Sequence, residues 1–411
     1  MNLTILSYAT LSDLLSDIFG VNIPLPIQTY GFFVAVAFIT ASFIMKLEYQ
    51  RKEREGLMCP LYKVGTIGQK ASAKELITSF FITFIICYKV VDVILNYSEF
   101  SANAQDFLMS PRGSWGGGII CGLIAAGYTW YDKDKHKLPK PKTVIFKQMP
   151  HQLAGNLLVV AGIFGILGAK LFHNLENLDK FIADPIGELF SFSGLTFFGG
   201  LIVGGTAGAL YLKKNNISSF HTLDCASPCI ALGYALGRVG CEVSGDGCWG
   251  IVNNNPCPSW LPEWAWSYKF PHNVVNSGIP IEDCGGNHCH ILSEGVYPTS
   301  LYESLMMLLI FGLLMLLRKK INFPGMLFGI YLTLQGVERL LIESIRVNNK
   351  FNLLGMEVTQ AQIIATCLML SGLTIIFLTW KYRERIKEIT RPVEQIPDIK
   401  AEIIEENNKK R

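Results

Sequence analysis

Long apolar segments constrain this chain more than any other feature of its sequence. Nine segments approach the roughly 20 mostly apolar residues that an α-helix needs to cross a bilayer. They are residues 27–45, 76–95, 115–131, 153–172, 190–211, 225–241, 300–317, 325–345 and 361–380. Of all 411 residues, 50% are hydrophobic and only 17% are charged, a balance that a soluble domain rarely has. The sequence therefore predicts an all-α, polytopic integral membrane protein with about nine transmembrane helices.

Basic residues follow alternate apolar segments, and this asymmetry predicts the orientation in the membrane. Clusters of Lys and Arg follow the first, third, fifth, seventh and ninth segments. Because such clusters are enriched on the cytoplasmic side, the N-terminus is predicted outside and the C-terminus in the cytoplasm. An odd number of spans requires the same arrangement. The polar residues 384–411 are predicted to form a solvated cytoplasmic tail.

The longest connection, residues 242–296, is placed outside the membrane by the same alternation. It carries four cysteines, Cys248, Cys257, Cys284 and Cys289. An extracytoplasmic compartment permits disulfides, so pairing among these four is predicted, with no defined connectivity and with free thiols as the alternative. No C-x-x-C pattern points to zinc, and no metal or cofactor is expected. The basic residues lie in short runs rather than in one patch, which argues against a nucleic-acid partner.

Ionisable residues inside the apolar segments are the candidates for function. A charge at the centre of a bilayer costs at least about 2.5 kcal/mol, so it is usually kept for pairing or for function. In the eighth segment Arg339, Glu343 and Arg346 are spaced by four and three residues and share one helix face. Arg238 lies among glycines in the sixth segment, where a ligand can approach closely.

Two arginines and a carboxylate that face a cavity form a plausible site for a phosphate monoanion. A guanidinium group pairs bidentately with phosphate oxygens and does not lose its proton. Two other readings stay open: Arg339 and Glu343 as an ion pair that only locks helices together, and Arg238 as a snorkelling arginine. In the second segment Lys89 and Asp92 are predicted to neutralise each other as a structural pair.

Several short motifs occur in a fixed order along the chain. They are Tyr30-Gly31, Gly168-Ala-Lys-Leu171, Gly199-Gly-Leu-Ile202, the stretch Asp224 to Gly250 with Gly237-Arg-Val-Gly-Cys241 and Gly245-Asp246, Tyr297-Pro-Thr-Ser-Leu-Tyr-Glu303, and Arg339 to Arg346. In this order they resemble the motifs of the prolipoprotein diacylglyceryl transferase family. The resemblance implies one integral membrane transferase domain over residues 1–383. Residues around 55–150 fall outside it and are predicted to be an insertion that adds a two-helix hairpin.

The resemblance also implies an activity and its partners. The family transfers the diacylglyceryl group of phosphatidylglycerol to the lipobox cysteine in the signal peptide of a prolipoprotein. A thioether forms and glycerol phosphate is released, which is the first step of bacterial lipoprotein maturation. The expected location is the lipid bilayer of the bacterial cytoplasmic (inner) membrane.

The motif positions carry over to a set of expected site residues. Arg238 and Arg339 are expected to stabilise the leaving phosphate, with Glu343 orienting Arg339. Asp246 or Glu303 is expected to bind glycerol hydroxyls or to receive the thiol proton. The expected headgroup-binding residues are Arg238, Arg339, Tyr30, Gly199, Gly200, Cys241, Ser244, Gly250, Tyr297, Glu303 and Arg346.

This sequence departs from the family pattern at several of these positions. Phe198 and Tyr297 stand where the family has motif histidines, and Cys241 and Ser244 stand where it has asparagines. A thiol close to two arginines ionises more readily, so the reaction is expected to proceed without a histidine base. Two rival readings remain: a family member with another acceptor, and a transporter whose buried Arg and Glu line a polar path.

Overall fold

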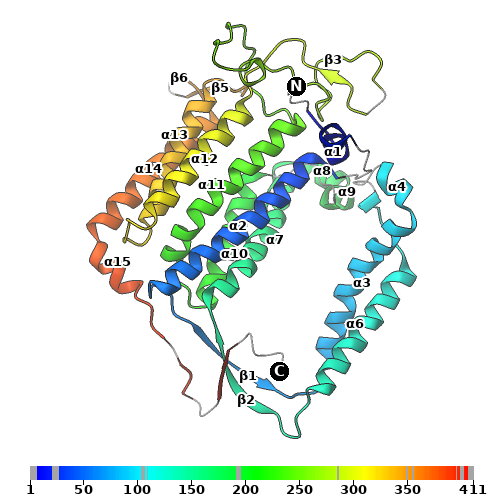
Figure 1. Ribbon diagram of the computed structural model, residues 1–411, viewed down its shortest axis with the longest axis vertical. Helices are drawn as coiled ribbons and strands as arrows, with labels where there is room; N and C mark the ends of the chain where they lie inside the picture. The colour runs from blue at the N-terminus through cyan, green and yellow to red at the C-terminus, as the bar shows by residue number, and fades with distance from the viewer. Residues whose placement is uncertain are drawn as a thin grey trace. The chain divides into compact units, whose positions relative to one another are not determined.

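The structure is a computed structural model, and it is predominantly helical (Figure 1). It describes residues 7–20, 27–102, 107–108, 110–190, 196–284, 287–348, 350–353, 356–394, 396–398 and 402–405. The chain divides into two compact units, which we describe separately. Unit 1 comprises Met1–Met58, Leu153–Val159 and Ala209–Pro392, and unit 2 comprises Cys59–Gln152, Val160–Gly208 and Val393–Arg411.

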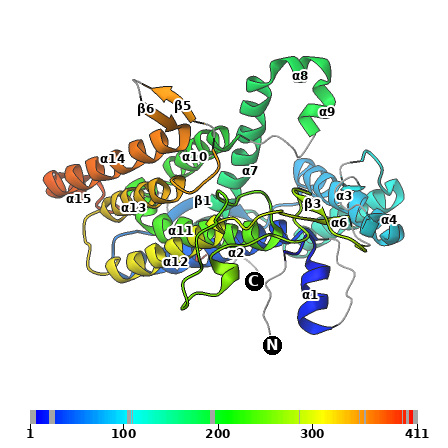
Figure 2. The same ribbon diagram turned by 90° about the horizontal axis from the view of Figure 1, so that it is seen from above.

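Unit 1 is built around a bundle of five long helices. They are α2 (Thr29–Arg54), α11 (Ser219–Ser244), α12 (Thr299–Leu317), α13 (Met326–Glu343) and α14 (Gln360–Lys381). Helix α11 lies between α2 and α12 (Figure 1), and α13 packs along α14 (Figure 2). Helices α2, α12 and α14 end at the same end of the bundle, so the basic residues in the last turn of α2 and after α12 and α14 gather there. This shared end agrees with the alternation of charge in the sequence.

Small residues let the central helices of unit 1 approach closely. Ala231 and Ala235 on α11 are fully buried against Met307 and Leu314 on α12 and Tyr331 on α13. On the outer surface, by contrast, large apolar side chains such as those of α12 remain exposed. In a membrane protein, packing between small residues and van der Waals contact associate the helices, while the apolar exterior faces lipid.

A buried carboxylate on α11 caps the start of α13. The backbone N–H of Gly325 donates to Asp224 Oδ2 at 2.9 Å, and the N–H of Phe328 donates to Oδ1 at 3.2 Å. Gly325 has a φ of 87°, a left-handed conformation that glycine adopts at little cost. The cap satisfies donors that the first turn of a helix otherwise leaves unpaired.

The described residues between 245 and 298 form a loop at the end of the bundle where α11 ends and α12 begins (Figure 1). The loop contains the short helix η1 (Glu263–Ala265) and the paired strands β3 (Ile279–Pro280) and β4 (His290–Ile291). Cys284 and Cys289 form a disulfide, which confirms pairing for two of the four loop cysteines. Cys248 and Cys257 are free thiols in the structure.

Three short elements complete unit 1. Helix α1 (Leu11–Phe19) precedes α2, the hairpin of β5 (Lys350–Leu353) and β6 (Met356–Thr359) joins α13 to α14, and α15 (Arg383–Ile389) follows α14. The Ncap residue Thr10 accepts a hydrogen bond from the N–H of Asp13, which fixes the start of α1.

Unit 2 contains a helical hairpin between two paired strands. Helices α3 (Ala73–Leu95) and α6 (Trp115–Lys135) pack together, with the short α4 (Tyr97–Ala102) after α3. A Cβ on Gly118 would lie 2.9 Å from the Phe84 ring, and one on Gly122 would lie 2.8 Å from the Phe80 ring. Glycine at these positions therefore lets the two helices approach.

Strands β1 (Leu61–Ile67) and β2 (Lys142–Gln148) flank this hairpin and pair antiparallel. Strand β7 (Glu402–Glu405), from the predicted solvated tail, adds to β2 in parallel. The all-α expectation is therefore wrong in detail: the protein is predominantly helical with small sheets. In β2 the apolar Val144 and Ile145 are each 1% exposed, and their burial stabilises a sheet that the search for long apolar segments overlooked.

Lys89 and Asp92 do not form the ion pair that their spacing predicts. Lys89 Nζ donates instead to the carbonyl oxygens of Phe107, Ser110 and Arg112, at 3.2, 2.5 and 2.6 Å. Asp92 Oδ2 lies 3.8 Å from Arg112 Nε. The connection between α3 and α6 supplies both sets of partners, which a three-residue spacing within one helix does not reveal.

The remaining helices of unit 2 include parts of α7 (Pro150–Glu176) and α10 (Phe197–Lys214), with α8 (Leu178–Ala183) and α9 (Pro185–Phe190) between them. Gly168 and Gly199 face each other: a Cβ on either would lie 2.5 Å from the backbone oxygen of the other. These glycines therefore permit direct contact between the backbones of α7 and α10.

Where the structure describes them, most residues of all nine predicted segments lie in helices, although the fifth segment begins at the end of α9 and continues in α10. Among the described residues, five helices are long and apolar enough to cross a membrane: α2, α3, α7, α12 and α14. The segments in α6, α10, α11 and α13 are helical as well but contain more polar or charged residues, or more glycine.

Candidate functional site

Glu303, in the first turns of α12, is the centre of a buried cluster of arginines. Its side chain is 0% exposed. Arg346 Nη1 lies 2.9 Å from Glu303 Oε1, Arg339 Nη1 lies 3.3 Å from the same oxygen, and Arg238 Nε pairs with Oε2. Helix α11 supplies Arg238, and α13 and the turn after it supply Arg339 and Arg346. Two segments far apart in the sequence thus converge on one carboxylate of α12.

Tyr234 joins this cluster from the turn of α11 before Arg238. Its hydroxyl donates to Glu303 Oε2 at 2.8 Å and accepts from Arg238 Nη2 at 3.1 Å. The Arg238 guanidinium carbon also lies 5.1 Å from the centre of the Tyr234 ring, within cation–π range. These contacts hold the guanidinium of Arg238 in one orientation.

Glu343 pairs with Arg339, as their spacing on one helix face predicts. Arg339 Nη2 lies 3.4 Å from Glu343 Oε2, and the Glu343 side chain is 0% exposed. The hydroxyl of Thr359, at the end of β6, donates to Glu343 Oε1 at 2.7 Å. Glu343 therefore ties Arg339 to the hairpin that precedes α14.

Gly250 connects the loop to the arginine cluster through its backbone. Its N–H donates to the carbonyl of Tyr297 at 2.8 Å, and it forms an antiparallel bridge with Arg346. A Cβ at this position would lie 2.4 Å from the carbonyl oxygen of Ile345. Only glycine allows the loop to approach the Arg346 backbone this closely.

Cys241, Asp246 and Cys248 lie together where α11 ends and the loop begins. One ligand atom from each lies within 4.8 Å of the others. Gly245, with a φ of 61°, turns the chain between them, and the N–H of Cys248 donates to Asp246 Oδ1 at 3.1 Å. A hydrogen bond from the Cys241 thiol lowers the pKa of Cys248 below its usual range. By distance alone, these three groups could bind one metal ion, a feature that the sequence did not predict.

The other expected headgroup residues occupy varied positions. Tyr30 is 44% exposed and its ring packs close to Gly240 on α11. Ser244 is fully buried, with its hydroxyl 3.4 Å from the Cys241 carbonyl oxygen. The Tyr297 hydroxyl accepts from Asn255 Nδ2 at 2.9 Å.

Two expected headgroup residues belong to unit 2. Gly199 and Gly200 contact the backbone of α7 there. The side chain of Phe198, which replaces a motif histidine, lies outside the described residues.

Two features of the site escaped the sequence reasoning. Tyr234 was not singled out, although it stands four residues before Arg238 and so shares its helix face. Glu303 was expected to contact substrate, whereas in the structure it holds three arginines. Only the packing of α12 against α11 and α13 reveals that second role.

The arginines retain capacity to bind a further anion. Each guanidinium carries five N–H donors. The described contacts to Tyr234, Glu303 and Glu343 use one or two donors of each arginine. The three side chains are also 15–21% exposed, so they are not sealed from a ligand. Planar, permanently charged groups in this arrangement suit bidentate contacts with phosphate oxygens.

A bundle of apolar helices with a buried arginine–carboxylate cluster at one end defines a membrane protein with a polar centre suited to anions. Comparison with known proteins then assigns the family. The model of the prolipoprotein diacylglyceryl transferase family matches residues 140–378, more than half of the chain. The chain belongs to this family.

Individual relatives agree with the family assignment. Phosphatidylglycerol–prolipoprotein diacylglyceryl transferases are 33% identical over 216 residues in Leptospira interrogans, 31% over 228 in Dehalococcoides mccartyi and 30% over 198 in Clostridium botulinum. These matches cover 46%, 55% and 48% of this chain. They cover 61%, 76% and 69% of the respective relatives. The chain thus spans less than two thirds of the length of the Leptospira relative.

Proposed function

We propose that this protein transfers the diacylglyceryl group of phosphatidylglycerol to the lipobox cysteine of prolipoproteins. The observation that carries the proposal is the convergence of Arg238, Arg339 and Arg346 on Glu303, in a chain of this family. The relatives are named for this reaction. Phosphatidylglycerol and a prolipoprotein signal peptide would then be the substrates.

The reaction requires one bond to form and one to break. The cysteine sulfur attacks the glyceryl carbon that bears the phosphate, a carbon–sulfur bond forms, and the carbon–oxygen bond to phosphate breaks. The electron pair of the broken bond leaves on the phosphate as glycerol phosphate. Arg238 and Arg339 would stabilise this growing negative charge, since preorganised donors act most strongly where charge develops in the transition state.

Glu303 and Glu343 would be positioning residues in this mechanism. Both are fully buried and paired with the arginines, so they hold the guanidinium groups in place before the lipid binds. Asp246 is the better candidate to receive the thiol proton, because it lies in the loop next to Cys248 rather than inside the ion-pair network. The positive charge of the arginines would favour the thiolate of the substrate cysteine.

The membrane arrangement is part of the proposal. Nine spans, with the N-terminus outside and the C-terminus cytoplasmic in the bacterial inner membrane, would put residues 242–296 and the arginine cluster on the outer side. The charge alternation of the sequence and the shared basic end of α2, α12 and α14 support this arrangement.

A transfer assay with purified full-length protein tests the function. The protein in detergent is incubated with phosphatidylglycerol and a lipobox peptide, and mass spectrometry follows the diacylglyceryl mass increase on the peptide. A peptide with serine in place of the cysteine is the negative control. Arg238→Gln should abolish transfer, whereas Lys319→Gln, which removes one exposed charge after α12, should not.

Two results of this assay would contradict different parts of the proposal. Transfer that persists in both Arg238→Gln and Arg339→Gln would contradict the proposed mechanism. Phosphatidylglycerol binding without transfer in the unmodified protein would exclude the lipobox cysteine as acceptor.

A further inference from the structure

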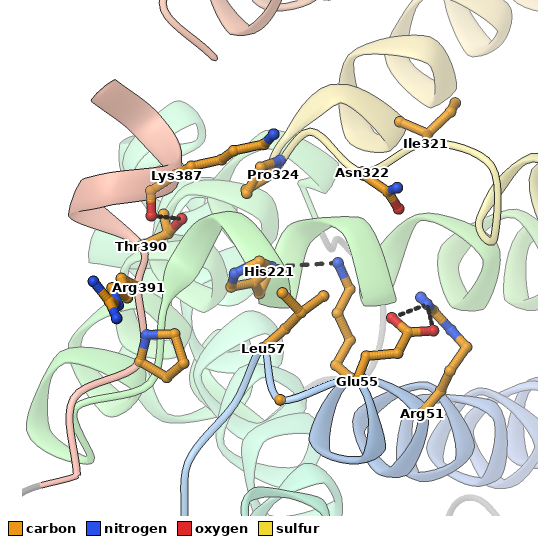
Figure 3. Close-up of a pocket in the computed structure, with 13 residues that line it drawn as sticks. Arg51, Glu55, Leu57, His221, Ile321, Asn322, Pro324, Lys387, Thr390 and Arg391 are labelled. Carbon is orange, nitrogen blue, oxygen red and sulfur yellow. Dashed lines mark hydrogen bonds and ion pairs between the residues drawn. The ribbon is translucent and has the colours of Figure 1, made fainter. Parts of the chain in front are cut away.

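A cavity of about 460 Å³ lies at the other end of unit 1, where α2 ends and α15 follows α14 (Figure 3). His221, in the first turn of α11, lines it. His221 precedes Arg238 by 17 residues on the same helix, so the cavity is separated from the arginine cluster by roughly 25 Å. It is therefore a different site from the one that binds the substrate lipid.

Basic side chains dominate the walls of this cavity. Arg51, Lys52, Lys387 and Arg391 line it, and Glu55 is the one acidic group among the lining residues. Figure 3 shows His221 facing the cavity from α11, with Lys387 and Arg391 extending from the segment that contains α15. Groups from three separate parts of the chain thus surround one space.

Ion pairs fix the wall of the cavity that α2 and α11 form. Arg51 pairs with Glu48 at 3.0 Å and with Glu55 at 2.8 Å, and Arg318 also pairs with Glu48. Lys52, only 6% exposed, lies 3.5 Å from Asp224. Because Asp224 also caps α13, this wall belongs to the framework of the bundle.

The wall that contains Lys387 and Arg391 has no such ion pairs among the described residues. The ion pairs around the cavity involve neither Lys387 nor Arg391. Lys387 Nζ lies 5.3 Å from the centre of the Phe323 ring. Around the cavity and its walls, five cations thus face three carboxylates, which leaves two positive charges in excess. The cations are Arg51, Lys52, Arg318, Lys387 and Arg391, and the carboxylates are Glu48, Glu55 and Asp224.

His221 adds a directed hydrogen-bond donor. Lys52 Nζ lies 3.3 Å from His221 Nδ1. An ammonium group has only donors, so Nδ1 must accept, and the proton of the neutral ring is on Nε2. His221 lines the cavity, so its Nε2–H is the donor that the ring could offer to a ligand there.

We propose that this cavity binds the phosphate group of an anionic ligand, with Lys387 and Arg391 as the charged contacts and His221 as a neutral donor. Two sources have this chemistry: the headgroup of a membrane phospholipid, and a small soluble phosphate compound. Basic pockets between helices at a membrane surface are suited to phospholipid headgroups, and the loss of one basic residue there weakens binding by about fivefold.

The test uses the full-length protein in an uncharged detergent, with cardiolipin and inorganic phosphate as separate probes. Native mass spectrometry measures bound cardiolipin, and the melting temperature measures phosphate binding against chloride at equal ionic strength. The pocket variant is Lys387→Gln with Arg391→Gln. The matched control is Lys319→Gln with Lys320→Gln, which removes two exposed charges after α12 that do not line the cavity.

A lipid site predicts that the pocket variant binds cardiolipin roughly tenfold more weakly or worse, while the control changes less than about twofold. A site for soluble phosphate predicts instead that phosphate raises the melting temperature of the unmodified protein and of the control, but not of the pocket variant. A variant with Lys387→Arg and Arg391→Lys keeps the charges and should retain binding. The proposal would be overturned if the pocket variant and the control lost binding of both probes equally, or if the pocket variant lost binding of neither probe.

Discussion

Arg346 is held between Glu303 and Gly250. Its Nη1 lies 2.9 Å from Glu303 Oε1, while its backbone forms an antiparallel bridge with Gly250 of the loop. The side chain of one residue thus enters the buried cluster, and its main chain fastens the loop that covers this end of the bundle. A disturbance of either contact is expected to reach both parts of the site.

Replacing Glu303 with glutamine should remove most transferase activity and destabilise the protein by about 3–5 kcal/mol, the usual effect of breaking a buried ion pair on one side. Three arginines would then remain close together without their shared counter-ion. Thermal unfolding in detergent and the transfer assay measure the two effects. Glu294→Gln, at an exposed position of the loop, is the control. A Glu303→Gln protein that unfolds and reacts like this control would show that the cluster does not need the charge.

Gly250→Ala should destabilise the protein by about 1–3 kcal/mol, because its methyl group would lie 2.4 Å from the Ile345 carbonyl oxygen. The loop would have to move away from Arg346, so the transfer rate should fall as well. Gly312→Ala on α12 is the matched control, since nothing lies within 4 Å of its new Cβ. That change should be neutral or slightly stabilising. Equal melting temperatures for the two variants would contradict the close approach at Gly250.

Cys241 and Cys248 should form a disulfide under mild oxidation with copper phenanthroline. Their sulfur atoms lie within 4.8 Å of each other. The reaction joins the two sulfurs, and the oxidant takes up two electrons while both thiol protons pass to solvent. Because Cys241 lies one turn after Arg238, the cross-link should also lower transferase activity. Maleimide labelling followed by peptide mass spectrometry detects the linked pair.

The exposed Cys257 serves as the internal control for this experiment, since it should stay labelled by maleimide. Labelling of both Cys241 and Cys248 after oxidation would show that the two thiols do not meet.

High pH should release the contact between Tyr62 on β1 and Glu394. The Tyr62 hydroxyl donates to Glu394 Oε1 at 2.5 Å, and this hydrogen bond raises the pKa of Tyr62 to about 12. The folded-state pKa lies above the ordinary value of about 10. The stabilisation is therefore fully present below pH 10 and is lost as the pH rises through 12. The difference in ultraviolet absorbance between the unmodified protein and Tyr62→Phe isolates this titration.

In Glu394→Gln the titration of Tyr62 should move back towards its ordinary pKa, because the carboxylate charge is gone. A midpoint that stays near pH 12 in this variant would contradict the assigned cause.

The apolar segments and their charge alternation determined the helical framework without any tertiary information. Among the described residues, most of each predicted segment lies in a helix, because apolar length is a local property of the sequence. The spacing of Arg339 and Glu343 likewise sufficed to predict their ion pair, since residues four apart on a helix are neighbours. The order of the motifs pointed to the family that the comparisons then established.

Only the tertiary structure decided which groups meet across helices. The role of Glu303 depends on α12 packing beside α11 and α13, and the partners of Lys89 depend on a turn 18 to 23 residues away. The strand β7 pairs with β2 across more than 250 residues of chain, so its short apolar stretch gave no local signal. Contacts of this kind arise from the register of packed elements. That register depends on the whole set of side chains at each interface rather than on any single segment.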